Sequence, residues 1–169
     1  WAIPLALLVA ADSKLNSVAE VIAFARSNPG KLNVATINIG STQNLAAEMF
    51  KSMTGIDAQI VPFKATSAVV TALRANDVHA AFEILAPVLS QIRGNAVKAL
   101  AVTSSQRFVG LPGTPTIAES GVAGYQASSW NGVSVRAKTP RPIIDRLNRE
   151  IVAALAAADV TQKMQDLGI

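Results

Sequence analysis

The feature that most limits the fold of this chain is the alternation of short apolar runs with segments of helical periodicity over residues 1–103. The apolar runs predict strands at residues 1–11, 32–37, 58–63, 78–82 and 97–103. Between them, apolar residues recur at helical spacing and predict helices at residues 17–27, 45–53, 67–75 and 87–92. Strands that alternate with helices indicate an α/β fold with a largely parallel sheet and helices on both of its faces.

The first apolar run, WAIPLALLVAA, could be the core of a signal peptide or a buried strand. No basic segment precedes it, it is too short to span a bilayer, and Pro4 disfavours a helix. A strand covered on both faces fits these observations better. Because the sequence opens on such a strand without an initiator Met, we expect residues that precede it to be missing from this sequence.

Several helix ends carry local signals. Ser17 and Glu20 have the S-x-x-E spacing of a capping box, in which side chains satisfy the free amides of a first helical turn. The run from Asn28 to Gly30 should end that helix. Gly55 should end the next one, since glycine readily adopts the left-handed conformation found after a helix.

The pattern changes after Thr103, where turn-forming residues fill positions 111–116. Thr116 is expected to cap a short helix that runs into Glu119. Residues 126–135 are expected to form a strand.

The longest helix should begin at Thr139-Pro140, with the threonine as its cap and the proline in its first turn. Asp159 should cap a final short helix that Gly168 ends. Apolar residues at helical spacing mark the face that the longest helix would bury: Ile144, Leu147, Ile151 and Leu155.

Composition excludes several classes of function. Hydrophobic residues make up 50% of the chain and charged residues only 15%, which is enough apolar material for a packed core. The net charge is +4, with eight Lys and Arg in residues 1–100 and seven in residues 101–169, so no basic stripe indicates nucleic-acid binding. The absence of cysteine excludes disulfides and thiolate metal sites. We expect no nucleic-acid partner, no cofactor and no direct membrane insertion.

The most informative local feature is the run Gly40, Ser41, Thr42, Gln43 and Asn44 between a predicted strand and a predicted helix. Glycine lets a ligand approach the backbone, and a helix N-terminus attracts a carboxylate or phosphate through its free amides and its dipole. The alternative is an ordinary capped turn. Neither the P-loop nor the Rossmann glycine spacing is present.

Other candidates are single residues. His79 is the only histidine, and Asp77 alone cannot complete a metal site, so we expect a hydrogen-bonded or surface histidine and no metal. Glu83 ends a strand, where open α/β sheets bind ligands, and is either a ligand contact or a solvated carboxylate. Trp130 either walls a ligand or belongs to the core. Without a Gly-x-Ser-x-Gly elbow, no catalytic residue is assigned and an enzyme is not expected.

Five segments occur in an order and spacing typical of one protein family. They are ARSNPGKLNVATINIGSTQNLAAEMF at 25–50, IVPFK at 60–64, KALAVTS at 98–104, LPGTPTIAESG at 111–121 and SWNG at 129–132. Together they resemble the tripartite tricarboxylate transporter receptor family, also called Bug solute-binding proteins. The resemblance covers nearly the whole chain.

This resemblance implies a periplasmic receptor of the periplasmic-binding-protein type II, or Venus flytrap, architecture. Such a receptor captures a small carboxylated solute and passes it to membrane transporter subunits. By resemblance, residues 10–101 form a complete second lobe, residues 1–9 a crossing strand from the first lobe, and residues 102–169 an incomplete returning part of the first lobe. Two crossing strands, 5–9 and 98–102, should then lie side by side.

The same division implies that the longest helix lacks partners for its apolar face. Exposed apolar surface of this kind drives association. If these 169 residues are the whole polypeptide, a dimer or an aggregate is expected.

Carried over by position, the family's second-lobe loop for a ligand carboxylate falls on Gly40–Thr42, and Lys64 matches the usual lysine. Asn44 stands where many members have histidine, and Glu83 stands where aspartate is common. Two further departures replace a frequent glycine by Ala65 and a frequent small polar residue by Ile84. These differences bear on which ligand is bound more than on its class.

One rival class shares the flytrap architecture, namely the effector-sensing domain of a transcriptional regulator. It would require a DNA-binding helix-turn-helix outside this sequence. The TPTIAESG and SSWNG segments favour the receptor.

Overall fold

The computed structural model describes residues 2–168; Trp1, which opens the first predicted strand, and Ile169 lie outside the described residues. All helices and strands predicted up to residue 103 are confirmed. In chain order the elements are β1 (Ala2–Ala10), α1 (Val18–Ser27), β2 (Leu32–Ile37), α2 (Thr42–Thr54), β3 (Ala58–Phe63), α3 (Thr66–Arg74), β4 (Ala80–Ile84), α4 (Leu85–Arg93), β5 (Val97–Val102), β6 (Ser128–Trp130), α5 (Arg141–Ala156) and α6 (Ala158–Asp166).

The sheet is mixed, which corrects the expected largely parallel arrangement. Its strands lie in the order β3-β2-β4-β1-β5, and β2 pairs in parallel with both β3 and β4. Strand β1 lies between β4 and β5 and is antiparallel to both. The sequence could not reveal this direction, because a strand covered on both faces has the same apolar pattern whichever way it runs.

The predicted pairing of residues 5–9 with residues 98–102 is confirmed. Strand β1 pairs with β5 from Ala6 opposite Val102 to Ala10 opposite Val97, with an irregularity between Leu7 and Leu8. The first residues of β1 also pair with β6, so one long strand joins the main sheet to the later part of the chain.

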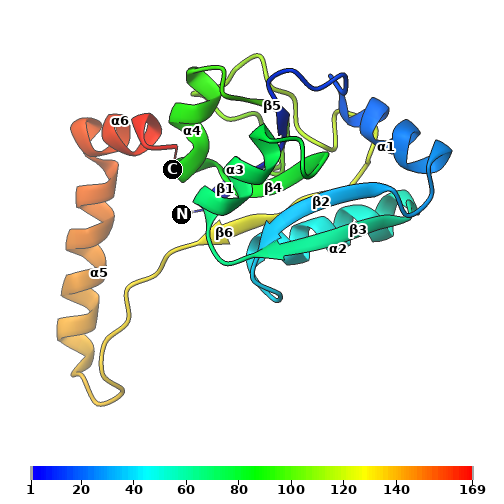
Figure 1. Ribbon diagram of the computed structural model, residues 1–169. Coiled ribbons are helices and arrows are strands. Elements are labelled where there is room, and N and C mark those ends of the chain that lie inside the picture. The colour runs from blue at the N-terminus through cyan, green and yellow to red at the C-terminus, as the bar shows by residue number, and fades with distance from the viewer. Residues whose placement is uncertain (1, 169) are drawn as a thin grey trace.

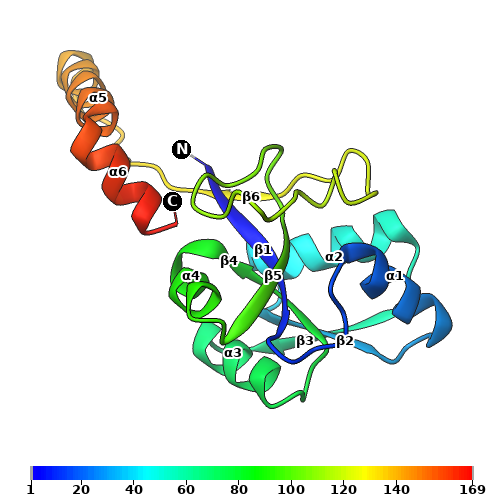
Figure 2. The same ribbon diagram turned by 90° about the horizontal axis from the view of Figure 1, so that it is seen from above.

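Helices cover both faces of the sheet (Figure 2), and a hydrophobic cluster lies on each face. Helices α1 and α2 cover one face, where Phe50 of α2 packs against Phe82 of β4 with ring centroids 5.7 Å apart. Helices α3 and α4 cover the other face through Val69, Leu73 and Val88. Residues of β1 contribute alternately to both clusters, because successive side chains of a strand point to opposite faces.

The segment after β5 returns over the α1–α2 face and is fixed by two polar side chains. The Thr103 hydroxyl accepts from the Leu5 amide at 2.9 Å and lies 2.7 Å from the Ala127 carbonyl, to which it donates. The buried Tyr125 hydroxyl donates to the Ala46 carbonyl of α2 at 2.8 Å. These bonds hold the approach to β6 against α2.

Within this segment the expected short helix at Thr116 is a turn. The Thr116 hydroxyl accepts from the Glu119 amide at 3.0 Å, and the Glu119 carboxylate accepts from the Thr116 amide at 2.8 Å. The reciprocal bonds of a capping box are therefore present, but the chain turns again at Gly121, where φ is +104°. At Ser17 the hydroxyl caps α1 as predicted.

The last part of the chain departs most from expectation. The strand predicted at 126–135 is reduced to β6, since only residues 128–130 have a paired neighbour. Pro140, and not Thr139, precedes the first residue of α5, and no side chain caps that helix. Helix α6 begins after Ala157, which places Asp159 inside its first turn and not at the cap.

Residues 131–140 leave the sheet as an extended segment, and α5 stands beside it, away from the sheet and its covering helices (Figure 1). No residue of α5 or α6 is buried. Gly168, just beyond α6, is buried and lies against Ala86 of α4. Leu147 is 41% exposed, whereas Ile144, Ile151 and Leu155 are half-buried, so the apolar face of α5 is only partly covered. No helix among residues 2–168 is long and apolar enough to cross a membrane.

Candidate functional site

Three parallel strands end at one edge of the sheet, and a helix begins after each of them. Strands β2, β3 and β4 end at Ile37, Phe63 and Ile84, and α2, α3 and α4 start within a few residues of these ends. Ligands of open α/β sheets bind outside the carboxyl ends of the strands, where helix N-termini also gather. The candidate site lies at this edge and contains six predicted residues, namely Gly40, Ser41, Thr42, Asn44, Lys64 and Glu83.

The loop before α2 is held by bonds among its own residues. Gly40 has a φ of +81°, a conformation that favours glycine, and its amide donates to Asn44 Oδ1 at 3.1 Å. The Ser41 hydroxyl accepts from the Asn44 amide at 3.1 Å and lies 3.2 Å from the Ile37 carbonyl, to which it donates. Ser41 and Asn44 therefore shape the loop, and the Ser41 hydroxyl is already engaged as both donor and acceptor.

Two amides of the same turn have no acceptor. Among the described residues, neither the Thr42 nor the Gln43 backbone N–H is hydrogen-bonded, and the Thr42 hydroxyl has no partner. No acidic side chain lies in the first turn of α2. The positive end of the helix dipole is thus uncompensated by this chain, which suits a bound anion.

Glu83 lies at the end of β4 and is fully buried, which excludes the alternative of a solvated carboxylate. Its Oε2 accepts from Gln43 Nε2 of α2 at 3.3 Å and from Thr66 Oγ1 of α3 at 3.0 Å. Its Oε1 is buried without a partner. Burial raises the pKa of Glu83, and the hydrogen bonds from Gln43, Thr66 and the Ile84 backbone oppose that rise.

Gln43 and Thr66 were not singled out as site residues from the sequence. A signal existed for Gln43, which lies inside the Gly40–Asn44 run, but its contact with Glu83 joins residues 40 positions apart. Thr66 follows Lys64 by two residues and shows no motif of its own. Contacts between residues so far apart in sequence can be predicted only when the order of the strands is known.

The remaining predicted residues lie farther from this network. Lys64 is exposed and forms no ion pair within residues 2–168. Trp130 is 76% exposed on β6, so it does not belong to the core. A shallow hollow lies between the start of α2 and the approach to β6, lined by Thr42, Leu45 and Ser128 among others, which places β6 near the candidate site.

His79 has a structural role, as the sequence indicates. Its Nδ1 accepts from the Asn33 amide at 3.1 Å, and its ring centroid lies 5.1 Å from that of Phe24. Burial lowers the pKa of His79, which favours the neutral form that can accept this bond. Within residues 2–168, no group of three or more His, Asp or Glu side chains could hold a metal ion.

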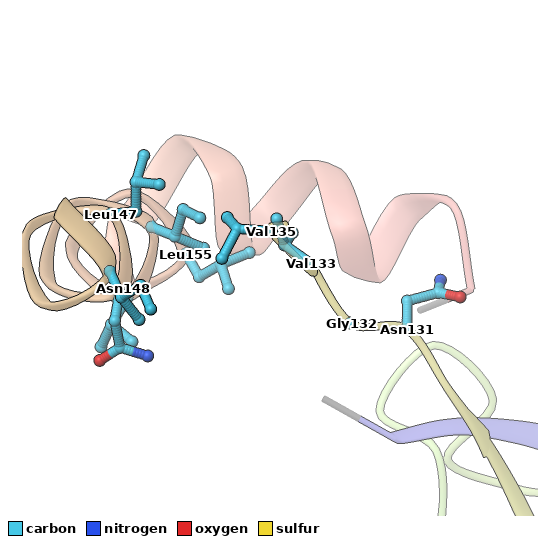
Figure 3. Close-up of a pocket in the computed structure, with 10 residues that line it drawn as sticks. Asn131, Gly132, Val133, Val135, Leu147, Asn148 and Leu155 are labelled. Carbon is cyan, nitrogen blue, oxygen red and sulfur yellow. The ribbon is translucent and has the colours of Figure 1, made fainter. Parts of the chain in front are cut away.

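A second hollow, between residues 131–135 and α5, has a different character. Val133 and Val135 of the extended segment lie beside Leu147 and Leu155 of α5 (Figure 3). Its lining contains no charged side chain. This surface suits apolar contact, whereas the edge near Gly40 suits an anion.

Comparison with known proteins shows how widely this arrangement is shared. The family described as "Tripartite tricarboxylate transporter family receptor" matches residues 2–169. This chain belongs to that receptor family. Its members are solute-binding receptors and not enzymes, and the sheet and helices described above match part of their fold.

Two relatives illustrate the similarity. A UPF0065 protein from the tcbD-tcbE intergenic region of Pseudomonas sp. strain P51 is 36% identical over 99% of this chain and 50% of its own length. The solved structure of R. palustris Rpa4515 with adipate is 34% identical, has a TM-score of 0.89, and is matched over 99% of this chain and 56% of that one.

MatC from Rhodopseudomonas palustris with bound malate is 28% identical with a TM-score of 0.82, over 99% of this chain and 57% of that one. Solved periplasmic binding proteins are among the receptors that share the fold. The chain spans about half the length of the relatives it matches.

Proposed function

We propose that this chain contributes the second lobe of a periplasmic receptor that captures a small dicarboxylate and delivers it to the membrane subunits of a tripartite transporter. The observation that carries the proposal is the first turn of α2, where the amides of Thr42 and Gln43 have no acceptor within the described residues. Free helix amides bind carboxylates through hydrogen bonds and the helix dipole.

The character of the ligand follows from the chemistry of this edge. Relatives of the same fold hold adipate and malate, each of which has two carboxylates. One carboxylate would occupy the start of α2 in this chain, with Gly40 allowing close approach and Thr42 adding its hydroxyl. Lys64 would add a solvated positive charge at the rim, and Trp130 would wall the side toward β6.

The division into lobes is part of the same proposal. Residues 10–101 would form the second lobe, and residues 5–9 of β1 contribute to both of its packed faces, which include none of residues 131–168. Residues 1–9 and 102–169 would belong to a first lobe that needs further residues, consistent with the uncovered face of α5. The other carboxylate of the ligand would then be held across the cleft. The family match favours a receptor over the effector domain of a regulator.

Calorimetric titration of the complete polypeptide with adipate, malate and the uncharged analogue adipamide tests the proposal. We expect the dicarboxylates to bind and adipamide to bind much more weakly, because an amide provides no charge for the helix start. Equal binding of adipamide, or no binding of any carboxylate in a wider panel of organic acids, would contradict the proposed function.

A further inference from the structure

Glu83 is the only acidic or basic side chain that is buried among residues 3–168. It lies at the carboxyl edge of the sheet, opposite Ala6 of β1 and just before α4. A buried carboxylate is costly unless donors or a cation compensate its charge. How this group is satisfied therefore indicates its protonation state and its role.

The two oxygens of Glu83 have unequal surroundings. Oε2 receives two side-chain hydrogen bonds, from Gln43 at 3.3 Å and Thr66 at 3.0 Å, and the Ile84 backbone amide lies nearby, whereas Oε1 has no partner and is shielded from solvent. An ionised carboxylate shares its charge between both oxygens and needs donors at each. A neutral acid has one carbonyl oxygen that accepts two bonds and one hydroxyl. The unpartnered Oε1 favours the neutral acid, because a neutral carboxyl group carries no charge that has to be compensated at that oxygen.

Among the described residues, no charged group forms an ion pair with Glu83. The strands on either side of β4, β1 and β2, contain no titratable residue, and the first turns of α2, α3 and α4 contain none. The charged residues of these helices lie in later turns: Glu48 and Lys51 in α2, Arg74 in α3 and Arg93 in α4. Lys64, close in sequence to Thr66, is exposed and makes no ion pair within the described residues. Burial is accordingly the largest cause of the raised pKa of Glu83.

Both partners of Glu83 belong to helix starts at the candidate site. Gln43 is the second residue of α2 and adjoins Thr42, whose amide is free, while Thr66 is the first residue of α3. We propose that Glu83 is a positioning residue whose carboxyl group ties these two helix starts together, and that carboxylate binding at the start of α2 favours its protonated form over its ionised form. This inference rests on the proposed function, because it assumes that an anion binds at the start of α2.

The coupling has a definite sign. An ionised Glu83 would place a negative charge beneath the helix start that receives the ligand carboxylate, and like charges disfavour each other's ionised forms. Ligand binding should therefore raise the pKa of Glu83 further. Affinity should be highest below the pKa of Glu83 in the free protein and should fall as the pH rises through it. Folding stability follows the same direction, because a raised folded-state pKa stabilises the fold at low pH and this contribution is lost as the pH rises through that pKa.

Two measurements on the complete polypeptide test the inference. The first is a carbon-detected NMR titration of Glu83 in the ligand-free protein, with the signal assigned by comparison with Glu83→Gln. We expect Glu83 to titrate above the ordinary range of glutamate. A midpoint in the ordinary range would overturn the neutral-acid assignment, whether or not any ligand binds.

The second is calorimetric titration with adipate across pH, in buffers of different ionisation enthalpy, which gives the protons taken up on binding. The wild type should take up protons near the Glu83 midpoint, and Glu83→Gln should remove that uptake while its amide preserves an acceptor for Gln43 and Thr66. Glu83→Ala should weaken binding by about tenfold because it removes two hydrogen bonds. Equal proton uptake in wild type and Glu83→Gln would overturn the coupling. If no carboxylate of the wider panel binds either form, the proposed function fails, and the NMR titration alone decides the state of Glu83.

Discussion

The packed α/β unit (residues 3–130) and the arm formed by residues 131–168 contain helices with similar apolar patterns, but these helices are buried to very different extents. In the packed unit, α2 buries Ala46, Ala47 and Phe50 against the sheet. In the arm, α5 carries an equally regular apolar face, yet none of its residues is buried (Figures 1 and 2). Helical periodicity identifies the face that a helix would bury, but a partner surface decides whether that face is covered.

The two regions also differ in role: the packed unit accounts for the stability of the fold, and the arm offers a surface for assembly. The packed unit contains both hydrophobic clusters and the candidate site, so we expect it to fold without the arm. The arm continues from β6 of the unit, and at its other end Gly168 lies against Ala86 of α4. Its exposed apolar residues are therefore available to another surface, which by the proposed function is the rest of the first lobe.

The largest contrast is expected from one truncation in each region. Phe82→Ala should lower the free energy of unfolding by about 3–5 kcal/mol, because the buried ring leaves a cavity between Phe50 and the sheet. Leu147→Ala should change it by less than about 0.5 kcal/mol, because its side chain is half-exposed. Urea unfolding of both variants measures the difference. Similar losses would show that the arm is part of the folding unit.

Self-association is the next largest effect. Expressed as these 169 residues alone, the chain should associate through the apolar face of α5. Leu147→Lys should weaken that association at least about tenfold, since a buried leucine contributes about 1.5–3 kcal/mol. Ala153→Lys adds the same charge to α5 away from that face and serves as the control. Sedimentation equilibrium at several concentrations gives the constants. A monomeric wild type at high concentration would refute the prediction.

A smaller contrast concerns helix capping. Ser41→Ala should cost the packed unit about 1 kcal/mol, because the hydroxyl caps α2 through the Asn44 amide. Thr139→Ala should have almost no effect, since Thr139 does not cap α5. Thermal unfolding at matched conditions resolves the two variants. A loss of stability in Thr139→Ala equal to that in Ser41→Ala would mean that the arm depends on its own cap.

The sequence was most informative where local rules decide the structure. Helix α2 was recognised from its apolar stripe, and its end at Gly55 follows from a left-handed φ of +63°. The direction of β1 could not be predicted, because a strand buried on both faces is apolar throughout whether it runs parallel or antiparallel to its neighbours. The strand predicted at 126–135 was too long. A strand needs a paired neighbour, and beyond Trp130 none is present in the described part of the chain.

The candidate site likewise contains residues that local sequence signals predict and contacts that depend on the packed fold. Gly40, Ser41 and Thr42 were found from the sequence, because glycine followed by hydroxyl residues before an apolar stripe marks a helix start. The burial of Glu83 was not predicted. It depends on Gln43 and Thr66, whose bonds span 40 and 17 positions of sequence and require the packed sheet to bring them together.

The central claim, that a ligand carboxylate binds at the start of α2, is tested most directly by two valine substitutions at opposite ends of that helix. Gly40 and Gly55 both have positive φ, +81° and +63°, and an added Cβ meets no atom within 4 Å at either position. Gly40→Val and Gly55→Val should therefore strain the backbone similarly, and only Gly40→Val should obstruct a ligand. Calorimetric titration with adipate should show a large loss of affinity for Gly40→Val and little change for Gly55→Val. Wild-type affinity in a folded Gly40→Val protein would place the carboxylate site elsewhere.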